Sequence, residues 1–137
     1  MKIEKIIDNN STLAIIIRGQ DWERGLNFPS SQEDYLQVGT WWYEKGKKIE
    51  PHIHSIFSRQ ALRTQEFIFI EQGRVRADIY TEGEKLLKSV ELKKGDTAIF
   101  LNGGHGFEIL EDDTKIIEAK NGPYFGKEKD KKIKNEK

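Results

Sequence analysis

The sequence predicts an all-β protein whose antiparallel strands pack as a sandwich or a barrel. Short runs of β-favouring residues recur along the chain, and turn residues separate them. No window longer than about ten residues shows a 3.6-residue apolar period, so little helix is expected. The chain has 137 residues, three tryptophans and seven phenylalanines, which is enough for one domain with its own core.

Eight runs of residues are expected to form the strands. They are 13–18, 35–43, 66–70, 75–80, 86–92, 97–101, 107–110 and 115–119. Glycine or acidic residues lie between the later runs and are typical of tight reversals, so antiparallel hairpins are expected there. One helical turn is expected over residues 30–35, after Pro29.

The first 126 residues are expected to form a single domain, and residues 127–137 a charged C-terminal tail. The tail reads KEKDKKIKNEK and contains one apolar residue, so it cannot bury enough surface to offset the entropy lost on ordering. It is therefore expected to be mobile or to dock against a partner. A polybasic membrane anchor is the less favoured alternative, because acidic residues dilute the lysines.

The composition argues against several classes of protein. Basic and acidic residues balance at 23 each, so the chain lacks the basic field that attracts nucleic acid. There are no cysteines, which excludes disulfides and thiol chemistry and fits the cytoplasm. The longest apolar run, residues 13–17, is far shorter than the roughly 20 residues that cross a bilayer. A soluble, cytoplasmic protein without nucleic-acid or membrane partners is expected.

The three histidines carry the strongest functional signal, because all of them lie in two short segments. His52 and His54 form a His-x-His pair, and on an extended strand both rings would face the same side. Neutral imidazole is the commonest protein ligand for divalent transition metals. The pair alone is more often a surface feature than a metal site. The surrounding glycines and His105 favour the metal hypothesis.

Two segments carry glycine and histidine at the spacing of a known family. In the first, Gly46 stands six positions before His52, and a glutamate stands seven positions before a later glycine. In the second, residues 95–107, a glycine leads through a turn to His105. These spacings resemble the two sequence motifs of the cupin superfamily, and the resemblance covers residues 43–119.

The resemblance implies a double-stranded β-helix, also called a jelly-roll or cupin barrel, that holds one divalent transition metal: zinc, iron, manganese, nickel or cobalt. The implied metal ligands are His52, His54, Glu66 and His105. Eleven residues separate His54 from Glu66, more than the family pattern has. Gln65 would face the other side of the strand, and a one-residue bulge would exchange it with Glu66. The carboxylate is preferred because its charge favours a dication.

Other residues near this framework suggest a ligand and a partner. Arg59 and Arg63 lie in the insertion before Glu66, where guanidinium groups could bind a carboxylate or phosphate, although a solvated loop is the simpler interpretation. Trp41 and Trp42 alternate across an expected strand, so one of them should face solvent, a ligand or a second subunit. A homodimer is expected from the family resemblance and from the need to cover edge strands.

The expected function is that of a metal-binding enzyme acting on a small polar molecule, with no catalytic residue assigned. Residues 103–124 also look similar to small cupins associated with bacterial surface-polysaccharide synthesis, which implies a sugar or nucleotide-sugar ligand. Isomerisation or epimerisation is the preferred reaction, with the metal as Lewis acid and a carboxylate or metal-bound hydroxide moving the proton. Two alternatives stay open: an iron-dependent dioxygenase, and a non-catalytic binding or regulatory module.

Overall fold

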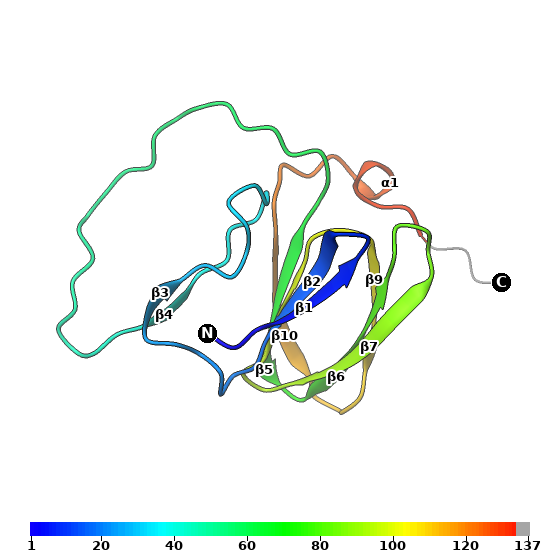
Figure 1. The fold of residues 1–137 in the computed structure, drawn as a ribbon, viewed down its shortest axis with the longest axis horizontal. Helices are drawn as coiled ribbons and strands as arrows, with labels where there is room; N and C mark the ends of the chain where they lie inside the picture. Colours follow the sequence, from blue (N-terminus) through cyan, green and yellow to red (C-terminus); the bar gives the residue numbers. More distant parts are fainter. Residues whose placement is uncertain (134–137) are drawn as a thin grey trace.

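The computed structural model describes residues 1–133, and in this part the fold is nearly all β (Figure 1). The elements in chain order are β1 (Glu4–Asp8), β2 (Ser11–Ile17), β3 (Gly25–Asn27), β4 (Thr40–Trp42), β5 (Glu66–Gln72), β6 (Arg74–Tyr80), β7 (Leu86–Lys93), β8 (Thr97–Phe100), β9 (Gly104–Ile109), β10 (Lys115–Lys120) and α1 (Lys127–Asp130). Every strand pairing is antiparallel, which confirms the predicted all-β, antiparallel class.

The strands form two larger sheets and a separate hairpin (Figure 1). One sheet has the order β1-β2-β8-β5-β10, the second has the order β7-β6-β9, and β3 pairs with β4. Strands β9 and β10 therefore each lie at an edge of a different sheet.

The main hydrophobic core lies between the two larger sheets. Alternate residues of β6, Val75, Ala77 and Ile79, are buried and belong to the same apolar cluster as Ile68 and Ile70 of β5. This period of two is the one expected of strands with one face turned to a core. The alternation sets the inner face of each strand, and so determines which polar residues near the strand ends point inward.

Strand β2 is buried on both of its faces, which explains its continuous apolar sequence. Ala14 and Ile16 pack in the main core, whereas Ile15 and Ile17 form a second cluster on the opposite face. The second cluster is covered by partly buried residues that include Trp22 and Val38. The segment between β2 and β5 therefore provides a cover for the outer face of the five-stranded sheet.

Several elements differ from the sequence-based expectation. The strand expected over 35–43 is reduced to β4, because the backbone N–H groups of Tyr35 and Leu36 bond to the Gln65 side chain instead of a neighbouring strand. Residues 30–35 form a hydrogen-bonded turn and no helical turn. The strand expected at 107–110 begins earlier, at Gly104. Strands β1 and β3 were not expected, because both are short and polar.

Residues 43–65, here called the arm, form neither strand nor helix. The arm leaves β4, runs well outside the two larger sheets, and returns to β5 (Figure 1). Its apolar side chains have little cover, since Ile53 is 96% exposed and Leu62 is 75% exposed. A structureless segment of this length is uncommon in a compact domain and is often functional.

The C-terminal residues up to 133 are described, and the remainder of the predicted mobile tail, residues 134–137, lies outside the described part. Asp130 of α1 accepts hydrogen bonds from the Thr64 hydroxyl and from the Lys120 ammonium. This part of the predicted tail therefore contacts the strands. Within residues 1–133, no helix is both long and apolar enough to cross a membrane.

Candidate functional site

A carboxylate and an imidazole from opposite sheets meet at one end of the sandwich. Ile68 and Ile70 are buried, so Glu66 lies on the same inner face of β5 by strand alternation. On β9, His105 pairs in register with Ile79, whose side chain is also turned inward. We call this region the Glu66–His105 end.

The two side chains are close, partly shielded and oriented by aromatic rings. His105 Nε2 lies 3.4 Å from Glu66 Oε2, and the side chains are 27% and 14% exposed, respectively. The ring of Phe100 stacks on the His105 imidazole at 4.4 Å between centroids, and the Phe107 ring lies at 5.3 Å. Phe100 is itself buried in the core, so it limits the orientations open to the imidazole.

The turn before β9 is fixed by the backbone conformation of Gly103 and by a hydrogen bond to the Glu82 side chain. Gly103 has a φ of +70°, and a Cβ there would collide with the Tyr80 carbonyl. Its N–H donates a 3.0 Å hydrogen bond to Glu82 Oε1, which also accepts a hydrogen bond from the Arg63 guanidinium. Arg63, and then the Gly103 N–H, hold the pKa of Glu82 below its ordinary value. The end of the arm is thus tied to the turn that leads to His105.

The side chains of Gln65 and Glu66 point to opposite sides of the backbone and therefore have different contacts. The buried Gln65 side chain accepts bonds from the backbone N–H groups of Tyr35 and Leu36, at 2.7 and 3.0 Å. Its Nε2 donates to the Leu101 carbonyl at 3.3 Å. No bulge exchanges the pair, and Glu66 is the residue that faces His105.

A third ionisable group lies beside the pair and was not singled out from the sequence. Lys120 of β10 pairs in register with Glu66, and its ammonium bonds to Asp130 at 3.3 Å. Asp130, and more weakly Glu118 and Glu66, hold the pKa of Lys120 above its ordinary value. The available signal was strand alternation from Ile116, which places Lys120 on the inner face.

The His-x-His pair is placed differently from the prediction. His52 and His54 lie on the exposed arm and on no strand, with ring centroids 5.1 Å apart. His52 Nδ1 contacts the Glu50 carbonyl oxygen at 2.8 Å. Pro51 lacks the N–H that a strand ladder requires, and none of the strands within residues 1–133 pairs with the arm. The expected interior-facing strand is therefore absent here.

The predicted metal ligands form two separate pairs in the structure. Glu66 meets His105, and His52 meets His54, but among residues 1–133 no group of three or more His, Cys, Asp or Glu side chains could hold a metal ion. Two ligand atoms each about 2.1 Å from a tetrahedral ion lie about 3.4 Å apart. The Glu66–His105 separation fits that spacing, whereas His52 and His54 lie apart from this pair on the arm.

The two predicted substrate-binding arginines already have partners within the chain. Arg59 lies over the Phe57 ring, 3.6 Å from its centroid, on the exposed part of the arm. Arg63 forms an ion pair with Glu82. Arg63 thus lies near the turn before β9, whereas Arg59 stays on the arm with the His-x-His pair.

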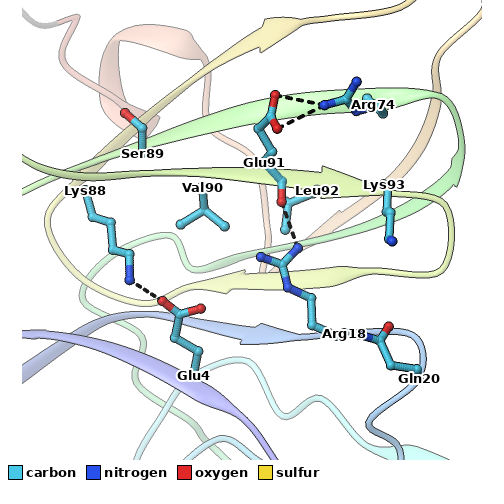
Figure 2. A pocket seen from close by; sticks show the side chains of 10 residues that line it. All are labelled: Glu4, Arg18, Gln20, Arg74, Lys88, Ser89, Val90, Glu91, Leu92 and Lys93. Atoms are coloured by element: carbon cyan, nitrogen blue, oxygen red, sulfur yellow. Dashed lines mark hydrogen bonds and ion pairs between the residues drawn. The ribbon is translucent and has the colours of Figure 1, made fainter.

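A groove of about 710 Å³ lies elsewhere, between the β1–β2 side of one sheet and β7 of the other (Figure 2). Most of its charged side chains are engaged with one another or with the backbone. Lys88 pairs with Glu4, Arg74 bonds Glu91 through both carboxylate oxygens, and Arg18 donates to the Glu91 carbonyl oxygen at 2.7 Å. The Lys88–Glu4 and Arg18–Glu91 contacts link the two sheets, and Arg74–Glu91 joins β6 to β7, so these contacts have a structural role.

Comparison with known proteins gives no relative, because no family model, no curated protein and no solved structure matches the chain. The functional inference therefore depends on the residues described above.

Proposed function

We propose that the Glu66–His105 end binds a small polar molecule, such as a sugar or nucleotide sugar, and moves a proton on it as an isomerase or epimerase does. The observation that carries this proposal is the 3.4 Å approach of a carboxylate and an imidazole from opposite sheets. Carboxylates and imidazoles are the usual groups for general acid–base catalysis, and histidine changes charge near neutral pH.

The chemistry requires two groups with complementary roles. Ionised Glu66 would remove the proton from the carbon next to the substrate carbonyl. His105 would donate its proton to the carbonyl oxygen, so that an enediol forms without a build-up of charge. Return of a proton to the former carbonyl carbon, with loss of the proton from the hydroxyl of the carbon that was deprotonated, gives the isomer. Return of a proton to the original carbon from the opposite face, with loss of the proton from the former carbonyl oxygen, gives the epimer. No oxidant or reductant is consumed.

Burial and stacking support this assignment of roles. The Glu66 carboxylate is only 14% exposed, so water competes weakly for it. The stacked Phe100 ring restricts the His105 imidazole, and a preoriented group avoids the entropy of positioning during reaction. A sugar hydroxyl or carbonyl would replace the present 3.4 Å contact by bonds to each group.

As the alternative to that acid–base role, we propose that Glu66 and His105 bind a divalent transition metal together with His52 and His54 of the arm, in which case neither ligand carries the proton. A bound metal would polarise a carbonyl or hydroxyl of the substrate. The eleven residues from Ser55 to Gln65 can span about 35 Å when extended, so chain length does not prevent the approach. Strand β9 also has a free edge, where an extended segment can find hydrogen-bond partners.

The proton-transfer proposal can be tested without knowing the substrate. The full chain is incubated in D₂O with a panel of aldoses, ketoses, sugar phosphates and nucleotide sugars, and NMR follows deuterium entering at the carbon next to the carbonyl. Glu66→Gln should slow the incorporation by about 10²- to 10⁴-fold, the usual contribution of a general base. The control is Glu108→Gln, whose outward side chain pairs with Arg76 on the same sheet.

Incorporation at the wild-type rate in Glu66→Gln would contradict the proposal, as would no incorporation with any compound in the panel. Oxygen uptake with iron would favour the dioxygenase alternative. Binding of a panel compound without isotope exchange would favour a binding module.

A further inference from the structure

The Glu66–His105 end also presents a cation on its inner face. Ile116 of β10 packs against the main core, so alternation places Glu118 and Lys120 on the same face of that strand. Lys120 pairs in register with Glu66, and its side chain is 34% exposed. An ammonium group therefore borders the proposed site and remains within reach of solvent.

The carboxylate of Asp130, in the C-terminal segment, forms an ion pair with the Lys120 ammonium. One oxygen of Asp130 contacts the Lys120 ammonium at 3.3 Å, and the other accepts a hydrogen bond from the Thr64 hydroxyl. The Asp130 side chain is only 12% exposed. An ammonium and a hydroxyl together holding two oxygens of one anion is an arrangement that recognises carboxylates and phosphates.

The contact between Lys120 and Asp130 is well suited to exchange. At 3.3 Å it is longer than the roughly 2.7–2.9 Å of a strong charge-assisted hydrogen bond. Water reaches the pair from the Lys120 side, which is 34% exposed, and this competition reduces the contribution of the ion pair to stability. Asp130, and then Glu118 and Glu66, hold the pKa of Lys120 above its ordinary value, so the ammonium keeps the charge that an anion needs.

We propose that Lys120 and Thr64 form an anion-binding subsite, in which a carboxylate or phosphate group of the substrate displaces Asp130. This inference rests on the proposed function and narrows its substrate class to hydroxy-carbonyl compounds that carry an anionic group. Asp130 then acts as an internal substitute for the substrate anion.

Phosphate and acetate serve as the two probes, and each is titrated into the full chain while ¹H–¹⁵N NMR follows the backbone amides. Phosphate should shift the amides of Thr64, Lys120 and Asp130. Asp130→Asn removes the competing carboxylate and should tighten phosphate binding by about threefold, in line with the small free energy of an accessible ion pair. Glu128→Gln is the matched control, because it removes one negative charge from the same helix.

Lys120→Gln should weaken phosphate binding by at least about tenfold, whereas Lys120→Arg should retain it. The control is Lys115→Gln, which removes the same charge from the other end of β10. Equal affinity in wild type and Asp130→Asn, or undiminished binding in Lys120→Gln, would overturn the subsite. Stronger shifts with acetate than with phosphate would identify the substrate anion as a carboxylate.

The subsite and the proposed reaction can fail separately. Phosphate binding at Lys120 does not require the Glu66 carboxylate, so Glu66→Gln should retain it. Phosphate binding without isotope exchange on any sugar would remove the proposed reaction and keep the subsite. Isotope exchange on neutral sugars without phosphate binding would remove the subsite alone.

Discussion

The two pairs of predicted ligands have opposite surroundings in one chain. The Glu66–His105 pair is built by strands of two facing sheets and is packed against Phe100. The His52–His54 pair lies on the arm, outside any strand, where its neighbour Ile53 is 96% exposed. Residues two positions apart, such as His52 and His54, lie near each other whether the backbone forms a strand or an irregular segment. The packing of the two sheets brings together Glu66 and His105, which are distant in sequence.

The arm differs from the sheets because a movement of the arm would bury apolar side chains that are now exposed. Ile53, Phe57 and Leu62 expose most of their apolar surface, so packing them against another surface would be favourable. The inner faces of the core strands, such as Val75, Ala77 and Ile79 of β6, have no such surface left to bury. A substitution in the sheets should therefore damage the present structure, whereas one in the arm should affect only states in which the arm packs.

The largest expected effect is on stability. Ile79 is 1% exposed and pairs in register with His105, so Ile79→Ala should lower the free energy of unfolding by about 2–5 kcal/mol through lost burial and a new cavity. Ile53→Ala on the arm is the matched control and should change it by less than about 0.5 kcal/mol. Urea unfolding measures both. An equal loss in the two variants would mean that the arm is packed as firmly as the core.

The next largest effect is expected on the affinity for a metal ion. If each pair supplies two ligands, the double variant His52→Ala/His54→Ala and the double variant Glu66→Ala/His105→Ala should each weaken Zn²⁺ or Co²⁺ binding by at least about tenfold. Competition against a chelator gives the affinities, and element-resolved analysis gives the metal content of the purified chain. Wild-type affinity in the arm variant would show that the arm takes no part in the site.

The smallest expected effect concerns acid stability of the three-stranded sheet. The Arg76 guanidinium, and then the Ser89 hydroxyl, hold the pKa of Asp78 below its ordinary value. The charged form is favoured on folding, so this stabilisation is present above the unfolded pKa of about 3.8 and is lost as pH falls through the lower folded value.

Asp78→Asn should therefore be less stable than wild type at pH 7, by up to about 1 kcal/mol, since Arg76 is accessible to solvent. The difference should shrink below about pH 4. Thermal unfolding between pH 7 and pH 2.5 follows it, with Asp112→Asn on an exposed turn as the control. A difference that stays constant over this range would show that the Asp78 charge contributes nothing.

Sequence reasoning was most successful where local pattern and long-range structure agree. Alternation and turn residues predicted β5 to β8 and β10 to within a few residues, because each packs one face on a core and is followed or preceded by a tight turn. The same alternation placed Glu66 on an inner face. It could not show that Tyr35 and Leu36 would bond to a side chain thirty residues away instead of forming a strand.

The candidate site was predicted only in part. Glu66 and His105 were expected to converge across the fold, and the structure brings them together. The position of the His52 segment depends on whether it finds a pairing partner, which its composition does not reveal. Lys120 and Asp130 were missed because the C-terminal segment was too polar to suggest packing, whereas Asp130 is held by hydrogen bonds to Thr64 and Lys120.

The most direct measurement of the central claim, that a proton is transferred at the Glu66–His105 end, is the rate of solvent-deuterium incorporation by His105→Gln. The side chain of glutamine can occupy the place of the imidazole near Phe100 but cannot act as a general acid or base at neutral pH. The expected result is a loss of about 10²-fold or more relative to wild type and to Glu108→Gln. Incorporation at the wild-type rate in His105→Gln would contradict the claim.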